Sequence, residues 1–402
     1  MKNKCFILTA YFILYFSPFI LYSQPSLRDL HFDFYGDPIS LKIDMPVETK
    51  PAGVLSSQSV KNYFSAINNT NYKPLITALL FYKAQYKLDD WLYYQLIRKT
   101  VQLISPKAEN YERYTVYKWF LLTSSGYGAT LKTGNGQLMF YVQTDEEIFN
   151  LPYYMRNGKQ YVCLNYHDYN HEGSEKDVFT EVDLAAQGGI KSFTYKVTQL
   201  PNFSPGDYIE KDLRFNFYQD EYHFKVKMNS QIKNIFANYP VVNCASYFNI
   251  PLSSETYQSL IPSLKKNTKG MNIKNGVDYL MRFTRYAFLF ETDTKNFGQE
   301  KRLSPEQTLL FDQSDCEDRA ALFFCLVKEI YNLPMIVLAF PKHVTIAVKF
   351  DKPVGKPIMY NGSQYSVCDP TPQSQDLSIG KLLPAIKKTA YEVVYAYNPA
   401  DK

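Results

Sequence analysis

The sequence predicts an α+β protein, because helical and strand-like patterns of apolar residues occur in separate runs along the chain. The chain has 402 residues, which is long for a single small core, so two or three domains are expected. Its 35 Tyr and 28 Phe residues are scattered through strand-like segments. We therefore expect most aromatic side chains to serve as sheet and core material.

Residues 1–23 have the features of a secretory signal peptide. Lys2 and Lys4 precede a charge-free apolar run from Cys5 to Tyr22, and Ser23 is a small residue before the expected cleavage site. This predicts a periplasmic or secreted protein. An uncleaved anchor is the alternative, because the run approaches the length of a membrane span. Later segments are too short or too polar to span, so no stable span is expected after cleavage.

Three regions are expected after the signal peptide. A mixed α/β region covers 24–170, a β-rich region covers 171–250, and the last region covers 251–402. The helical segments expected are 56–105, with Asp89 or Asp90 starting its last helix, 111–122, 255–264 and 277–290. The strand-like segments expected before residue 251 are 30–47, 137–143, 160–164, 178–196 and 212–228.

Cys316 lies in the first turn of a predicted amphipathic helix. Ser314 and Glu317 have the spacing of a capping box, and Asn332-Leu333-Pro334 is expected to end the helix. The apolar positions with helical spacing are Ala320, Phe324, Val327, Ile330 and Tyr331. Because a helix start is electropositive and has unpaired N–H groups, we expect the pKa of the Cys316 thiol to be lowered.

Strand-like segments follow this helix and carry the other candidate residues. The segment 335–340 reads as a buried strand, and 343–350, whose apolar residues alternate, reads as a second strand. Asn361-Gly362 is a hairpin signal between two further strands. His343 begins one strand, and Asp369 follows the end of another. The order predicts Cys316 as nucleophile, His343 as base and Asp369 as the group that orients the imidazole.

These residues give the segment 275–395 a resemblance to the transglutaminase-like superfamily. In its papain-like core, a nucleophilic Cys begins a helix, a His follows on the next strands, and an Asp lies one strand later, matching Cys316, His343 and Asp369. The stretches Phe297 to Lys301, Asp315 to Arg319 and Cys368 to Thr371 are similar to those of secreted transglutaminase-like proteins of Bacteroidetes-type bacteria. The resemblance implies a catalytic domain at 251–402 that cleaves a peptide, isopeptide or glutamine side-chain amide through a thioester.

Several details bear on the reaction. The backbone N–H of Cys316 is the expected first oxyanion donor, whereas Gln307, Gln313 and Tyr286 remain candidates for the second. Arg319 and Lys342 are candidates for stabilising a thiolate. Cys316 lacks a following Trp, and His343 lacks the aromatic neighbour of many relatives. Hydrolysis is therefore expected rather than amine transfer, which must exclude water.

The expected partner is a protein or peptide substrate in the cell envelope. The alternative is a catalytically inactive transglutaminase-like envelope protein that binds or assembles, because a buried Cys and a lone His are commonly structural. The formal net charge is +5 without a dense basic cluster, so no nucleic acid is expected. Five cysteines remain after Cys5, and their spacing fits no zinc pattern, so neither a metal nor a cofactor is expected.

An internal similarity links the first and last regions. The segment 157–165 resembles 361–369, and each follows a predicted helix and strand-like segments. In this comparison Asn165 stands opposite Asp369, and Tyr111 lies near the position corresponding to Cys316. We hypothesise that 24–170 contains a degenerate copy that is structural or binds substrate.

Overall fold

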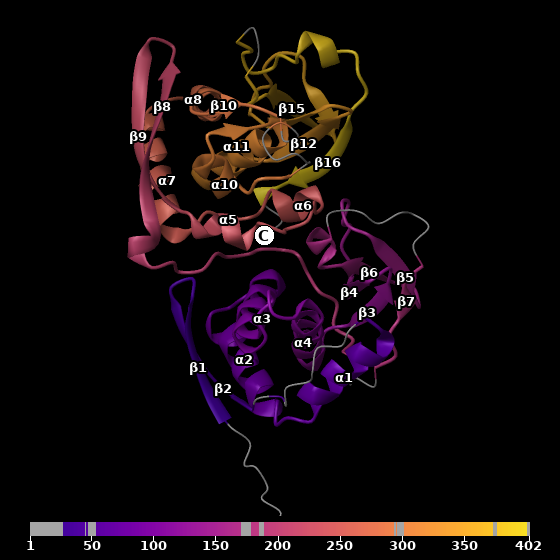
Figure 1. Cartoon of the computed structure of the whole chain (residues 1–402). Helices are drawn as coiled ribbons and strands as arrows, with labels where there is room; N and C mark the ends of the chain where they lie inside the picture. The colour runs from indigo at the N-terminus through magenta and orange to yellow at the C-terminus, as the bar shows by residue number, and fades with distance from the viewer. Residues whose placement is uncertain are drawn as a thin grey trace, which may run out of the picture.

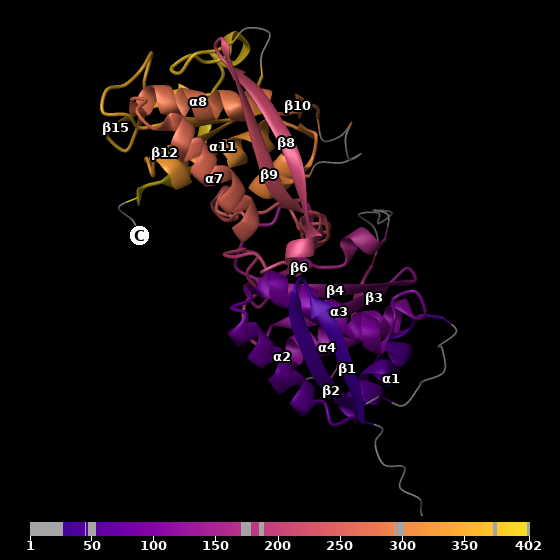
Figure 2. The same cartoon turned by 90° about the vertical axis from the view of Figure 1, so that its left-hand side faces the viewer.

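The computed structural model describes residues 27–44, 46, 54–169, 178–184, 189–292, 295, 301–372 and 376–399. The predicted signal peptide and residues 297–300 lie outside the described residues. Helices and largely antiparallel sheets alternate along the chain, which confirms the α+β class. The chain forms two lobes, one indigo to magenta and one pink to yellow (Figures 1 and 2).

The N-terminal lobe combines a hairpin, a group of helices and a five-stranded sheet. The helices are α1 (Ser57–Asn68), α2 (Lys73–Gln85), α3 (Asp90–Ile104) and α4 (Tyr111–Ser124). The strands are β1 (Leu27–Phe34) and β2 (Asp37–Asp44) of the hairpin, then β3 (Ala129–Gly134), β4 (Gln137–Thr144), β5 (Tyr153–Arg156), β6 (Lys159–Cys163) and β7 (Thr180–Glu181). The helices predicted at 56–105 and 111–122 are thus confirmed.

The strand predicted at 178–196 is mostly wrong. In the described part of that range, only Thr180–Glu181 forms a strand. Phe193, Tyr195 and Val197 are buried in alternation, and the segment forms an isolated bridge between Tyr127 and Lys191 and a backbone hydrogen bond from Phe193 to Gln143 of β4, without a continuous strand ladder. The alternation therefore reflects an extended segment that buries one face against the core, and the sequence pattern does not distinguish this from sheet pairing.

The C-terminal lobe places helices beside a long hairpin and a second five-stranded sheet. Its helices are α5 (Gln231–Ile235), α6 (Cys244–Tyr247), α7 (Ser254–Thr268), α8 (Ile273–Tyr286), α10 (Pro305–Leu310) and α11 (Cys316–Ile330). Its strands are β8 (Tyr208–Phe217), β9 (Asp220–Asn229), β10 (Leu289–Phe290), β11 (Gln313–Ser314), β12 (Met335–Phe340), β13 (His343–Val348), β14 (Ile358–Tyr360), β15 (Ser363–Cys368) and β16 (Glu392–Tyr397). The predicted helix 277–290 therefore ends earlier, at Tyr286.

The β8–β9 hairpin belongs in space with the helices that follow it. Figure 2 shows the hairpin lying along α7 and α8. The ring of Phe215 in β8 packs edge-on against Tyr279 and Phe283 of α8, at centroid distances of 5.0 and 5.5 Å. The expected β-rich region 171–250 thus contributes its longest strands to the packing of the last region.

The two five-stranded sheets have the same topology. Their strand orders are β5-β6-β4-β3-β7 and β14-β15-β13-β12-β16, and helices α4 and α11 precede them in the chain. The first hairpin of each sheet closes on equivalent pairs, Gly134 with Gln137 and Phe340 with His343. The turn residues Asn157-Gly158 and Asn361-Gly362 all have positive φ, as such hairpin turns require. The shared order and register support the hypothesis of an internal repeat.

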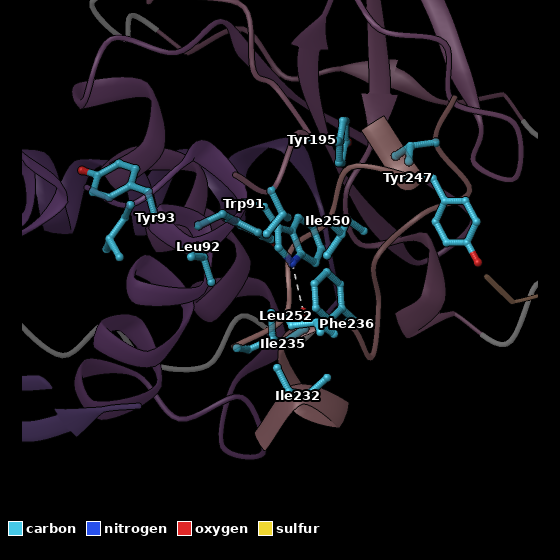
Figure 3. Close-up of a cluster of buried hydrophobic side chains, with 14 of the residues drawn as sticks. Trp91, Leu92, Tyr93, Tyr195, Ile232, Ile235, Phe236, Tyr247, Ile250 and Leu252 are labelled. Atoms are coloured by element: carbon cyan, nitrogen blue, oxygen red, sulfur yellow. Dashed lines mark hydrogen bonds between the residues drawn. The ribbon is translucent and has the colours of Figure 1, made fainter. Parts of the chain in front are cut away.

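A buried cluster joins the lobes. Figure 3 shows Trp91 of α3 beside Ile235 and Phe236, which lie in α5 and directly after it. The indole Nε1 of Trp91 donates a hydrogen bond of 2.9 Å to the carbonyl oxygen of Ile235. Tyr195 and Ile250 are buried in the same cluster. Because the contact is apolar and its polar atom is paired, it fixes the lobes against each other.

Candidate active site

Cys316 is the first residue of α11, as predicted, but the cap differs from the prediction. The N-cap is Asp315, whose Oδ1 accepts the backbone N–H groups of Glu317 at 3.1 Å and Asp318 at 3.3 Å. Ser314 is wrong as the cap, because it lies in β11, paired with Phe290, and its buried hydroxyl has no hydrogen-bond partner among the described residues. A carboxylate at the N-cap suits the positive end of the helix.

His343 and Asp369 form a buried pair at the edge of the second sheet. His343 opens β13, and Asp369 follows β15, the strand that pairs with β13. Nε2 of His343 lies 2.9 Å from Oδ2 of Asp369, and both residues are at most 7% exposed. The carboxylate can only accept, so we assign the proton to Nε2, which leaves Nδ1 of His343 with a lone pair.

Backbone contacts hold this carboxylate in place. Oδ1 of Asp369 accepts the N–H of Thr371 at 3.0 Å, and its carbonyl oxygen accepts a hydrogen bond from the guanidinium of Arg285. The same guanidinium binds Asp376, which also accepts a hydrogen bond of 2.8 Å from the hydroxyl of Tyr286. Asp369 is therefore fixed from both its side chain and its main chain.

Cys316 reaches the strand that carries His343. The backbone N–H of Val344, the residue after His343, lies close enough to the sulfur to lower the pKa of the thiol. The structure therefore brings the helix start and the His343–Asp369 pair together. Within the described residues no hydrogen bond joins the sulfur to His343; the thiol instead donates to Oε2 of Glu317 at 2.8 Å.

The environment of Cys316 opposes ionisation of the thiol. Burial raises the pKa of Cys316 far above its usual range, and the negative charge and hydrogen bond of Glu317 raise it further. The N–H of Val344 acts in the opposite direction with a smaller effect. The expectation of a lowered pKa is wrong for this arrangement, because desolvation and an adjacent carboxylate outweigh the helix terminus.

The three candidates for the second oxyanion donor occupy different settings. Tyr286 donates its hydroxyl to Asp376, and Gln313 lies in β11 opposite Leu289. Gln307 lies in α10, where its Oε1 accepts the N–H of Ser304 and its buried Nε2 has no partner. Only Gln307 thus combines burial with an uncommitted side-chain N–H, but this alone does not assign the role.

Arg319 does not serve the sulfur. Its guanidinium is buried and donates to four carbonyl groups at and after the end of α8, those of Thr284, Arg285, Phe288 and Leu289. Burial lowers the pKa of Arg319 to about 10. These contacts pair carbonyl groups around the end of α8, and they tie α11 to the helix whose Arg285 holds Asp369. This positioning role was not predicted.

Another side of the site is formed by α6 and the segment before α10. The hydroxyl of Tyr247 in α6 donates to the carbonyl of Leu303 at 2.7 Å and lies 3.2 Å from Oδ1 of Asp318, and Arg302 donates to the carbonyl of Val242 at 2.8 Å. Burial raises the pKa of Cys244, the charge of Glu317 raises it further, and the charge of Arg302 lowers it. Glu317 therefore lies close enough to influence both thiols.

The first sheet carries no such triad at the equivalent positions. Register places Gln137 opposite His343, and the turn alignment places Asn165 opposite Asp369. Nδ2 of Asn165 donates to the hydroxyl of Tyr111 at 2.7 Å, and that hydroxyl donates to Asp168 at 2.9 Å. Tyr111 is the first residue of α4, as Cys316 is of α11, and its phenol contacts Asn165 as the imidazole of His343 contacts Asp369. The correspondence of Gln137 with His343 was not predicted, because the similarity at 157–165 does not reach it.

Three further observations concern the described residues as a whole. Cys163, Cys244, Cys316, Cys325 and Cys368 are all free thiols. The described part of the chain contains no cluster of three or more His, Cys, Asp or Glu residues suited to a metal ion. No helix within the described ranges has the length and apolar character needed to cross a membrane.

Comparison of the chain with protein-family models, with curated proteins and with solved structures gives no match in any of the three.

Proposed function

We propose that the protein is an exported cysteine hydrolase of the transglutaminase-like type, which cleaves an amide bond of a protein or peptide in the cell envelope. The observation that carries this proposal is the buried pair of His343 and Asp369, next to a cysteine at a helix start. A histidine whose Nε2 is committed to a carboxylate presents Nδ1 as a base, which is the role that a cysteine nucleophile needs.

The proposed reaction proceeds in two stages. The thiol exchanges its hydrogen bond from Glu317 to Nδ1 of His343, which takes the proton, and the sulfur then attacks the amide carbon. The oxyanion forms near the backbone N–H of Cys316, and the imidazolium protonates the leaving amine. Water activated by His343 then hydrolyses the thioester, releasing the acid and restoring the thiol.

The proposal is tested by comparing wild type with Cys316→Ala on isolated envelope proteins. New amino termini are counted by terminal-labelling mass spectrometry, and ammonia release reports cleavage of glutamine side chains. We expect wild type, but not the variant, to generate one of these products. Equal product from both proteins would rule out Cys316 as the nucleophile.

A non-enzymatic role in envelope binding or assembly is the second candidate. It is favoured by the bond between the Cys316 thiol and Glu317 and by the raised pKa of that thiol. In that case Cys316 should alkylate with the pH dependence of a buried thiol, and His343→Ala should not change the rate. A slower rate in His343→Ala near neutral pH would favour the hydrolase instead.

A further inference from the structure

The carboxylate of Glu317 lies against the proposed nucleophile and has no cationic partner in the described structure. Its Oε2 accepts the thiol proton of Cys316 at 2.8 Å, and its backbone N–H is used by the helix cap. Among the described residues, no Lys, Arg or His side chain forms an ion pair with Glu317. A half-buried carboxylate without a counter-ion is costly unless a partner neutralises it.

The described residues around Cys316 and Glu317 include acidic groups and the cation of Arg302. Asp315 lies on the same helix, and α6 contributes Cys244 and Tyr247, whose titrations respond to Glu317. His343 of β13 lies next in the chain to Val344, whose N–H is close to the Cys316 sulfur, and its ring is paired with Asp369. The guanidinium of Arg302 donates to the carbonyl of Val242 and lies 5.6 Å from the centroid of the Tyr247 ring.

We infer that Glu317 is a specificity residue that keeps the Cys316 thiol protonated at rest and selects substrates carrying a positive charge beside the reacting amide. This inference rests on the proposed hydrolase function. A lysine or arginine side chain of the substrate pairs with the Glu317 carboxylate, and the thiol is released from it. The proton then passes from sulfur to Nδ1 of His343, giving a thiolate and an imidazolium without any other reactant.

The electrostatic reason is direct. Before a cation binds, ionisation of Cys316 would place two negative charges within hydrogen-bond distance, which strongly disfavours the thiolate. A cation at Glu317 removes most of that repulsion and favours the thiolate by its own charge. Activation is thereby coupled to the presence of the correct substrate, so the free enzyme would react slowly with small electrophiles.

The first test needs no substrate. Alkylation of Cys316 by iodoacetamide is followed by peptide mass spectrometry across pH in wild type, Glu317→Gln and Glu329→Gln. Glu329 is the matched control, because it lies in the last turn of the same helix. We expect Glu317→Gln to alkylate about tenfold faster near neutral pH, which corresponds to a thiol pKa lower by about one unit. An unchanged profile in Glu317→Gln would overturn the inference.

The second test uses peptide amides that differ only in Lys or norleucine next to the reacting bond. Wild type should favour the Lys peptide in kcat/KM by about tenfold, and Glu317→Gln should lose most of that preference. If Glu317→Gln abolishes turnover of both peptides while slowing alkylation, Glu317 is a base and the inference is wrong. If wild type turns over neither peptide and His343→Ala leaves alkylation unchanged, the hydrolase proposal fails, and the alkylation profile still decides whether Glu317 holds the thiol.

Discussion

Among the single residues of the candidate site, Asp369 has a carboxylate that is firmly held in place. Its two oxygens are committed to different partners, the ring of His343 and the N–H of Thr371, so side chain and loop are fixed together. An imidazole held in this way has one tautomer and one orientation, and the geometry of a base depends on both. We therefore expect the reactivity of Cys316 to depend strongly on Asp369, although no hydrogen bond among the described residues joins Asp369 to the sulfur.

We expect Asp369→Asn to lower kcat by about two to four orders of magnitude, because the amide no longer stabilises the imidazolium or fixes the proton on Nε2. Substrate KM should change much less. Asp351→Asn is the control, since Asp351 is exposed and lies beyond the end of β13. The rates are measured on the peptide amides, with circular dichroism to verify folding. A folded Asp369→Asn protein with wild-type kcat would contradict the role.

The sequence indicated Cys316, His343 and Asp369, because residue type and segment order are properties of the chain. It did not indicate the bond between Cys316 and Glu317 or the carbonyl contacts of Arg319, which depend on where side chains point after the elements pack. The capping residue was misassigned by one position. Ser314 and Asp315 are both good caps, and the pairing of β11 with β10 decides between them.

Among the elements, α3 shows how a cap can carry a pH dependence. Its N-cap is Asp89, one of the two caps expected, whose carboxylate accepts the N–H groups of Leu92 at 2.9 Å and Thr198 at 3.2 Å. Burial raises the pKa of Asp89 to about 6, although these hydrogen bonds oppose the change. The folded state therefore holds this proton more tightly than the unfolded chain. The resulting stabilisation is fully present below the unfolded pKa and is lost as pH rises through about 6.

Asp89→Asn should remove this pH dependence while keeping one cap acceptor. The free energy of unfolding of the variant minus that of wild type should increase by about 1–3 kcal/mol when the pH is raised from about 4 to about 7.5. Urea unfolding at the two pH values measures the difference. Asp89→Ala serves as the control: it should show the same pH trend but lose about 1 kcal/mol at both values, because it lacks a cap. A difference between Asn and wild type that does not vary with pH would refute the argument.

Over the whole molecule, the helices and hairpins were largely predictable and their assembly was not. Turn signals and periodicity are local, so Asn361-Gly362 and the apolar face of α11 could be recognised directly. The packing of β8 on α8, and the burial of the extended segment around Tyr195, involve residues far apart in the chain. The sequence indicated the hypothesised repeat only at the turn and strand that both regions share, because Tyr111 and Gln137 lie at the positions that correspond to Cys316 and His343.

Trp91 fills the junction between the lobes and donates its indole N–H to the carbonyl of Ile235 across it. Trp91→Phe should cost about 1–3 kcal/mol, from lost volume and an unpaired carbonyl, and should split a single thermal transition into two. Differential scanning calorimetry measures both effects. The matched control is Trp119→Phe, since Trp119 is the chain's other tryptophan, is buried within the N-terminal lobe and has an indole N–H without a partner in the part of the chain that the structure describes. That variant should lower the transition temperature without separating the lobes, so equal splitting by both variants would show that Trp91 does not couple them.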